Sequence, residues 1–443
     1  MRRDPGGANL SALRGHNAAL VLDLLRTAGE EGISRLELAE RTGLTPQAVS
    51  KITARLRAEG LAAEAGRRAS TGGKPRTVLR LVPTAAYAVG VHLDRDELTL
   101  ALTDLTGAPL AVRRRPLALA DGPDPVLAAV TDGVRALLAG ARTPAPDGRP
   151  RPGAHGAPEG GVAGPPAPGS GSVPAPGSAP GSAPGSAPGS VPAPVLGVGV
   201  AMPGPLDHRL GVPGRVTGAP VWEGFAVREV LEGRLGLPVV LDKDTNAAAL
   251  GLAVRPGAPR SFAYVHLGTG LGAGLVVGGA PLRGERTGAG ELGHQTVQLD
   301  GPRCGCGARG CLEVLCLAAV ARGELPGAAR ILGTGAANLV RLLDIDRVLL
   351  GGRVVLGAPE VFADGVSAVL ADLRLPTPVE VTAVPDAVVL GAAQLALAPF
   401  FGLAPPPGAA PGPAPDSPTG SPPDSAPGSS AGSSADRSEE LIT

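Results

Sequence analysis

Two long stretches of the chain have a composition that cannot build a hydrophobic core. Residues 143–194 contain 27 glycines and prolines among 52 positions, with a repeated Ala-Pro-Gly-Ser unit, and residues 401–443 are similarly rich in Pro, Gly and Ser. Such segments bury too little apolar surface to offset the entropy lost on ordering, so both are expected to be disordered. About 350 residues remain, enough for two or three folded units. We therefore expect residues 143–194 to interrupt a loop of a folded domain and residues 401–443 to form a tail.

Residues 1–82 have the pattern of a winged helix-turn-helix. Ser34 and Glu37 have the spacing of a capping box at the start of a helix, and Thr45 with Pro46 suits the start of the next one. A basic, glycine-rich loop between two short apolar segments then predicts the wing. The expected elements are helices over 17–27, 34–43 and 45–60 and strands over 61–64 and 77–81.

The third helix carries a short polar face that can approach the major groove of DNA, because Val49, Ile52 and Leu56 cluster on the opposite face. Residues 1–80 contain 14 Lys or Arg against 8 Asp or Glu, whereas the whole chain is balanced at 40 and 40. We expect a double-stranded DNA operator as partner; a helical interaction domain with a basic loop is the alternative. The candidate DNA contacts are Gln47, Ser50, Lys51 and Arg55 on the helix and Lys74 and Arg76 on the wing.

From residue 83 to residue 400 the pattern becomes that of an α/β protein. Apolar runs end in glycine or acidic residues, as buried strands do when they end at a ligand cleft. We infer a body of two lobes, with residues 143–194 as an excursion from a loop of the first. The expected elements are strands over 86–93, 98–107, 195–204, 238–244, 261–270 and 347–353 and a helix over 125–138.

The cysteines indicate a metal site in a reducing compartment. Cys304, Cys306 and Cys311 form a CxCx4C cluster, a spacing that suits tetrahedral zinc with one further ligand, and Cys316 is expected in the core. Three reduced thiols in a loop are the alternative. No run of 18 apolar residues exists and the first nine residues are polar, so we expect a cytoplasmic protein without a membrane partner.

Several motifs resemble the ROK family of repressors and sugar kinases. They are LGTGLGAGLVVGG at 267–279, ELGH at 291–294 and CGCGARGCLE at 304–313, supported by GVAMPGPLD at 199–207 and DKDTNAAALG at 242–251. The resemblance implies a two-lobed fold of the actin-like ATPase class for the body. Family members with an N-terminal winged helix are generally transcriptional regulators, and those without one are generally sugar kinases. This chain resembles the regulators.

The resemblance also implies the residues of two sites. His294 would complete the zinc site with the three cysteines. The family's sugar ligands map to Lys243, Asp244, Glu291, His294 and Glu313, with Gly204 and Thr217 as further candidates. Glu291 and Asp244 could instead simply cap helices. Lys243 stands where the family usually has Asn, and an ammonium there makes a phosphorylated or acidic sugar conceivable.

Kinase activity is not expected, although Asp244 matches the position of the family's catalytic base. Family kinases carry an Asp-x-Gly-Gly-Thr-Lys pattern at the first hairpin, where this chain has His92, Asp94, Arg95, Asp96 and Glu97. Carboxylates in place of glycine and lysine would repel a polyphosphate and block its approach to the backbone.

The segment after Cys311 is about two helices shorter than in the family, which bears on stability and subunit contacts. We expect a homodimer or homotetramer.

The leading hypothesis is a sugar-responsive, DNA-binding transcriptional regulator that represses genes of carbohydrate metabolism. Its effector would be a sugar or a sugar phosphate. The alternatives are an ATP-dependent sugar kinase and a DNA-binding protein whose sugar domain is a ligand-independent scaffold.

Overall fold

A computed structural model describes residues 10–68, 76–142, 193–382, 384 and 386–403. The two stretches expected to be disordered, 143–194 and 401–443, lie almost entirely outside these residues, and so does Lys74 of the wing. Among the helices within the described ranges, none has the length and apolar character needed to cross a membrane.

The N-terminal module is a winged helix-turn-helix, as expected. Ser34 forms the predicted capping box, since its hydroxyl accepts from the Glu37 N–H (3.3 Å) and its own N–H donates to the Glu37 carboxylate (2.8 Å). The Thr45 hydroxyl accepts from the Ala48 N–H (3.2 Å) and starts the third helix at Pro46. The elements are α1 Leu10–Ala28, α2 Arg35–Thr42, α3 Pro46–Ala58 and a sheet in the order β1 (Ile33–Ser34), β3 (Arg76–Leu81), β2 (Ala62–Arg68).

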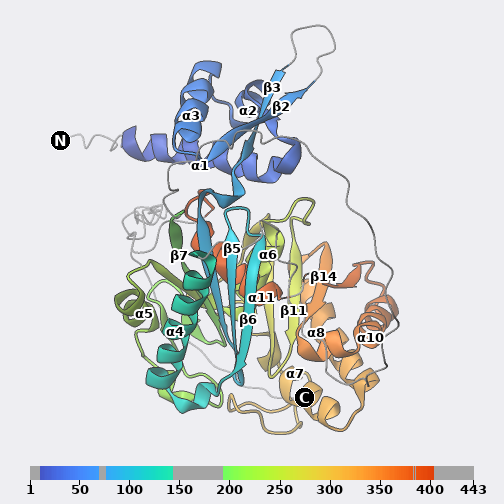
Figure 1. The fold of residues 1–443 in the computed structure, drawn as a ribbon. Coiled ribbons are helices and arrows are strands. Elements are labelled where there is room, and N and C mark those ends of the chain that lie inside the picture. Colours follow the sequence, from blue (N-terminus) through green and yellow to red (C-terminus); the bar gives the residue numbers. More distant parts are fainter. Residues whose placement is uncertain (1–9, 69–75, 143–192, 383, 385, 404–443) are drawn as a thin grey trace, which may run out of the picture. The chain divides into compact units, whose positions relative to one another are not determined.

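The first lobe of the body is built on a five-stranded sheet in the order β10-β7-β4-β5-β6 (Figure 1). The strands are β4 Tyr87–Leu93, β5 Glu97–Asp104, β6 Pro109–Pro116, β7 Val195–Met202 and β10 Val239–Lys243. Strands β4, β7 and β10 run parallel, and β5 and β6 continue antiparallel. Helices α4 (Pro123–Arg142) and α5 (Val227–Leu235) enclose a core around the fully buried Trp222, whose indole N–H donates to the Leu119 carbonyl (2.8 Å).

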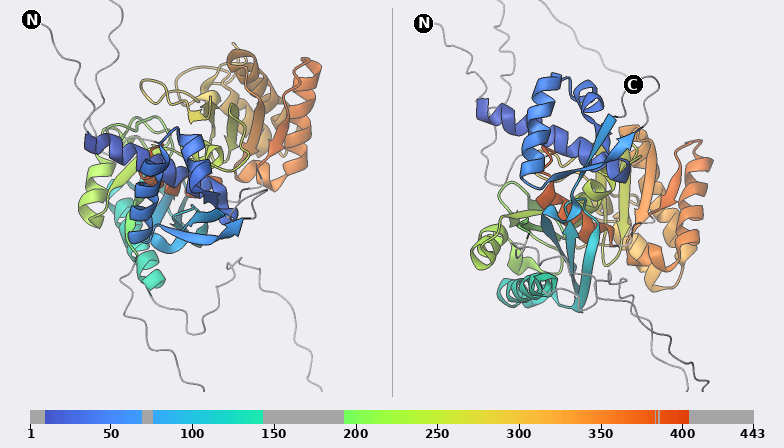
Figure 2. Two further views of the ribbon diagram at one scale, coloured as in Figure 1. Left: turned by 90° about the horizontal axis from the view of Figure 1, so that it is seen from above. Right: turned by 45° about the horizontal axis from the view of Figure 1, so that its top comes forward.

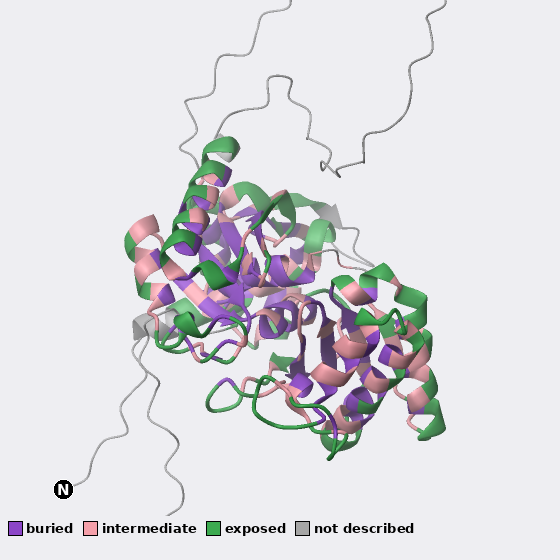
Figure 3. Ribbon diagram, turned by 90° about the horizontal axis from the view of Figure 1, so that it is seen from below, coloured by how far each residue is buried: buried purple, intermediate pink, exposed green. Residues whose placement is uncertain are grey.

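The second lobe repeats this plan with the order β13-β12-β11-β14-β15. Its strands are β11 Phe262–Leu267, β12 Leu271–Val277, β13 Ala280–Pro281, β14 Arg347–Gly351 and β15 Val379–Val381. Helices α7 (Leu312–Ala321), α8 (Leu325–Leu343) and α10 (Pro359–Asp372) lie on the outer side of the sheet (Figure 2). Although the segment after Cys311 is short, these three helices share a continuous buried core with β11, β12 and β14. Burial is therefore concentrated at the centre of each lobe (Figure 3).

Two helices, α6 (Asp244–Ala253) and α11 (Ala387–Leu397), pack against each other and join the lobes. Small residues allow this close approach: a Cβ on Gly391 of α11 would lie 1.9 Å from the Ala247 carbonyl oxygen of α6, and one on Gly251 of α6 would lie 2.7 Å from Gly391 Cα. Two similar lobes joined in this way confirm the expected actin-like fold. All six predicted strands and the helix at 125–138 are present.

The N-terminal module shares a hydrophobic core with the first lobe. Val21, Leu22 and Leu25 of α1 belong to the same buried cluster as Leu397 at the end of α11 and Phe401. Such a shared core makes the module a packed part of the described unit rather than a tethered one.

Candidate functional site

The five residues implied for sugar binding and the two further candidates line one pocket, at the ends of β7 and β10 and facing the β11–β12 hairpin. Apart from Thr217, they come from four parts of the chain: the turn after β7, the β10–α6 junction, the short helix Leu292–His294 with the preceding Glu291, and the first turn of α7. The pocket has a volume of about 60 Å³. Among its lining residues are Gly204, Lys243, Asp244, Glu291, His294 and Glu313, and Thr217 lies there too.

Lys243 does not extend into solvent. Its side chain is 2% exposed, and the ammonium donates to the Glu291 carboxylate (2.8 Å) and to the Ala289 carbonyl (2.6 Å). Gly204 leaves room for the lysine stem, because a Cβ at this position would lie 2.8 Å from Lys243 Cδ. A buried ammonium is tolerable when it is paired in this way.

Asp244 begins α6, and its carboxylate accepts from the Thr245 N–H (2.6 Å). Burial raises the pKa of Asp244 to about 7, and the nearby carboxylates of Asp94 and Glu291 act in the same direction. A carboxyl group in this state can both donate to and accept from a hydroxyl near neutral pH.

Glu313 connects the pocket to the cysteine cluster. It stands two residues after Cys311, and its carboxylate accepts from the Leu271 N–H (2.8 Å) at the start of β12. The first turn of α7 thus holds the β11–β12 hairpin that forms one side of the pocket.

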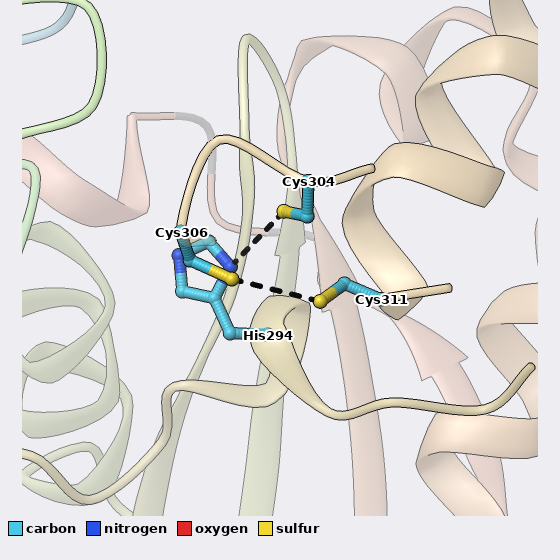
Figure 4. A group of neighbouring side chains, drawn as sticks. All are labelled: His294, Cys304, Cys306 and Cys311. Carbon is cyan, nitrogen blue, oxygen red and sulfur yellow. Dashed lines mark hydrogen bonds between the residues drawn. The ribbon is translucent and has the colours of Figure 1, made fainter. Parts of the chain in front are cut away.

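The four predicted metal ligands converge (Figure 4). One ligand atom from each of His294, Cys304, Cys306 and Cys311 lies within 4.8 Å of the others. Cys304 Sγ is 3.7 Å from His294 Nδ1, and Cys306 Sγ is 3.7 Å from Cys311 Sγ, far beyond the roughly 2.05 Å of a disulfide bond. Three thiols and one imidazole around a common point are a donor set that fits tetrahedral zinc.

The β4–β5 turn, where a nucleotide's phosphates would be expected from the resemblance, is filled by charged side chains. Arg353, at the start of the short helix α9 (Arg353–Gly357), donates to Asp94 (2.7 Å) and to Asp96 (2.8 Å). Arg95 donates to the Thr269 carbonyl (2.9 Å), and the Thr269 hydroxyl donates to Asp94 (2.7 Å). Burial alone would raise the pKa of Asp94, but His92, Thr269 and Arg353 together lower it to about 2. These contacts tie the two lobes together across the cleft.

Sequence reasoning missed Arg353 because only the fold brings it to the β4–β5 turn. A second cavity of about 190 Å³, lined by His92, Tyr264, His266 and Arg353, lies beside the turn. Burial lowers the pKa of both histidines, that of His266 to about 4. The Tyr264 hydroxyl is 3.0 Å from His266 Nδ1, whereas His92 Nε2 has no hydrogen-bond partner in the described part of the chain.

The predicted DNA-contacting residues of α3 lie on its exposed face. Gln47, Ser50, Lys51 and Arg55 are exposed, whereas Val49 and Leu56 are buried on the opposite face. Arg55 lies 3.6 Å from Glu59 in a solvent-exposed pair. Arg76 is exposed at the start of β3, and Lys74 lies outside the described residues.

Comparisons with known proteins match both parts of the chain. Residues 189–323 match the ROK family model, and residues 21–62 match a winged helix-turn-helix DNA-binding model. Kanosamine kinase of Amycolatopsis mediterranei (strain S699) is 33% identical over 222 residues, which cover 42% of this chain and 72% of the kinase. The xylose repressor of Bacillus subtilis (strain 168) is 25% identical over 284 residues, which cover 64% of this chain and 61% of the repressor.

A solved structure shares the fold over most of the chain. A ROK family transcriptional regulator, described as a homologue of the E. coli MLC protein, aligns with a TM-score of 0.63 at 22% identity and covers 88% of this chain and 98% of that one. The matched segments span about three fifths of the length of the xylose repressors. With the kinase relative, the matching motifs and the shared fold, the chain belongs to the ROK family and carries an N-terminal winged helix-turn-helix.

Proposed function

We propose that this protein is a sugar-responsive transcriptional regulator, acting as a repressor of carbohydrate metabolism genes in the cytoplasm. The proposal rests on one observation: a single packed unit contains both an exposed, basic recognition helix and a pocket lined by side chains that can bind sugar hydroxyls. The xylose repressors among its relatives support the same function.

In this proposal a homodimer or homotetramer presents two α3 helices to the half-sites of a roughly palindromic operator. A sugar in the pocket shifts the lobes and thereby the spacing of the two helices. Since the two binding events are linked, operator DNA must change sugar affinity by the same factor as sugar changes operator affinity.

His294, Cys304, Cys306 and Cys311 would hold a structural zinc ion. Its chemistry there would be to neutralise the thiolates and fix their geometry. Because Cys311 precedes α7 and His294 ends the Leu292–His294 helix, the ion would fix the backbone next to Glu313 and Glu291, both of which line the pocket.

A sugar kinase is the second candidate, favoured by Asp244 and by the kanosamine kinase and glucokinase relatives. Against it stand Asp94 and Asp96, whose pairing with Arg353 occupies the turn that should face the phosphates.

A ligand-independent scaffold is the third candidate. It is favoured by the 60 Å³ pocket, since ligand pockets usually measure roughly 300 to 1,000 Å³. For a regulator, the lobes have to open before a sugar enters.

The test is a gel shift with the promoter region of the protein's own gene at fixed salt, with and without a panel of sugars. We expect one sugar to weaken operator binding at least tenfold, or about 1.4 kcal/mol of coupling. Binding that no sugar alters would favour the scaffold. Absence of DNA binding together with sugar-dependent ATP consumption would favour the kinase.

A further inference from the structure

The charge on Lys243 is already used within the protein. Its ammonium, on a side chain that is 2% exposed, makes two short contacts, with the Glu291 carboxylate and the Ala289 carbonyl. The lysine stem passes close to Gly204, where a Cβ would lie 2.8 Å from Lys243 Cδ. Turning the ammonium toward a ligand would leave Glu291 without its counter-ion in a half-buried place, which is unfavourable.

The rest of the pocket does not attract an anion either. Its charged lining residues are four carboxyl groups, of Asp94, Asp244, Glu291 and Glu313, and two cations, Lys243 and Arg95. The guanidinium of Arg95, the second cation, donates to the Thr269 carbonyl (2.9 Å), so it too already has a hydrogen-bond acceptor within the protein. A phosphate in the pocket would meet more carboxylates than unpaired cations.

The same groups suit hydroxyls well. A carboxylate has several lone pairs, and one contact with Lys243 leaves Glu291 able to accept more hydrogen bonds. Its side chain is 35% exposed, so it remains reachable from the pocket. Asp244, which also lines the pocket, adds a carboxyl group at the start of α6.

We infer that Lys243 is the internal counter-ion of Glu291 and that the pocket therefore selects sugars that carry no phosphate or carboxylate group. The inference rests on the proposed function, because it concerns the effector of that regulator. It makes Lys243 a specificity-determining residue that acts through Glu291, and it predicts that a phosphorylated sugar is the wrong effector class.

Four proteins test the inference: the wild type, Lys243→Met, Glu291→Gln and the double variant. Without ligand, Lys243→Met should lower the melting temperature by several degrees, and the double variant should recover a large part of this loss because neither charge is left unpaired. Additive losses would overturn the counter-ion role. Glu285→Gln is the matched control, because Glu285 lies on the same loop but is 84% exposed and pairs with Arg209 at the surface.

Calorimetric titration with D-xylose, D-glucose, D-glucose 6-phosphate and D-gluconate tests the selectivity. We expect the wild type to bind a neutral sugar on the order of tenfold or more tighter than either anion. Glu291→Gln should gain affinity for glucose 6-phosphate, because it releases the ammonium. Tighter binding of the phosphate by the wild type, lost in Lys243→Met, would overturn the inference.

If none of the four compounds binds, the selectivity is overturned. The operator gel shift decides separately whether the protein is a regulator, since it depends on α3 and on the response to the full sugar panel.

Discussion

At the scale of single residues, Asp244 has the ionisation that depends most on the fold. Burial raises its pKa from the ordinary 3.8 to about 7. A group whose pKa is higher in the folded than in the unfolded state stabilises the folded state. This contribution is complete below the pKa of the unfolded state, and it is lost as the pH rises through the pKa of the folded state. The stabilising contribution of Asp244 therefore falls between about pH 4 and pH 7 and is absent at pH 8.

We predict that Asp244→Asn removes part of this pH dependence, because an amide of nearly the same shape has no proton to lose. The melting temperature of the wild type should fall more between pH 5 and pH 8 than that of the variant. Thermal denaturation at several pH values measures the difference, with Asp364→Asn on the exposed side of α10 as control. Equal slopes for wild type and Asp244→Asn would show that the carboxyl group titrates normally.

For the cysteine cluster, we predict that Cys306→Ser lowers bound zinc from about one ion per chain toward none. The melting temperature should drop by roughly 5 to 10 °C, since losing a structural ligand costs a few kcal/mol in a domain of this size. Atomic absorption on the purified protein measures the metal.

Cys316→Ser is the control for this change. Cys316 is buried, donates to the Ala328 carbonyl (3.5 Å) and lies outside the cluster. Its variant should keep the metal. Equal zinc content in Cys306→Ser and the wild type would contradict the zinc site.

The residues that could be predicted are those whose partners are close in the sequence or marked by a motif. Cys304, Cys306 and Cys311 lie within eight positions, so their spacing alone indicated a cluster. Arg353 and Asp94 are 259 positions apart, and no local pattern connects them. The role of Lys243 could not be predicted from the sequence either, because its pairing with Glu291 depends on how the loop before Glu291 folds back onto β10.

At the scale of secondary-structure elements, α3 is the surface that should contact DNA. We predict that Lys51→Ala weakens operator binding by about 1 kcal/mol, or roughly fivefold, and lowers the dependence of log K on log salt by about one, because the side chain brings a positive charge to the DNA groove. Gel shifts over a range of salt concentrations measure both effects.

The control for Lys51→Ala is Arg341→Ala, which removes a positive charge from the exposed last turn of α8 in the second lobe. It should leave operator binding unchanged. If Lys51→Ala binds like the wild type, Lys51 lies outside the interface.

Elements with a strong local pattern were predictable and others were not. Helices α2 and α3 of the N-terminal module carry their own N-caps, and the central strands are continuous apolar runs. Strand β6 was missed because it is an edge strand with the sequence PLAVRRRP, whose mostly exposed residues lack alternation. Strand β1 has only two residues and forms by pairing with β3, so its signal is not local.

At the scale of the whole molecule, α6 links the pocket to the N-terminal module. The helix begins at Asp244 in the pocket, and the carbonyl of Val254, just after its end, accepts from Arg26 of α1 (2.9 Å). Arg26 also pairs with Asp23 (2.6 Å) and lies 5.2 Å above the ring of Phe401. A movement of α6 on sugar binding would therefore reach α1 directly.

We predict that Arg26→Met reduces the sugar-induced change in operator affinity by about 1 kcal/mol, or roughly fivefold, because it removes this link but keeps an apolar stem against Phe401. Gel shifts with and without the effector measure the ratio. Arg80→Met, on the exposed face of β3, is the control. An unchanged ratio in Arg26→Met would mean that the response does not travel through α6.

The division into an N-terminal winged helix and a two-lobed body could be predicted, because each part has its own periodicity and motifs. The shared core between α1 and the end of α11 could not, since Leu25 and Leu397 are 372 positions apart and the apolar residues of α1 could equally form the core of a free module.

Trp222 has an experimental consequence. It is the only tryptophan of the chain, and it is fully buried in the core of the first lobe. Intrinsic emission excited at the indole band therefore reports on that lobe alone, whereas circular dichroism averages over every helix. If the two signals follow one denaturation curve, both lobes and the N-terminal module unfold in a single step. If the two curves differ, the Trp222 emission shows whether the first lobe unfolds before or after the rest of the molecule.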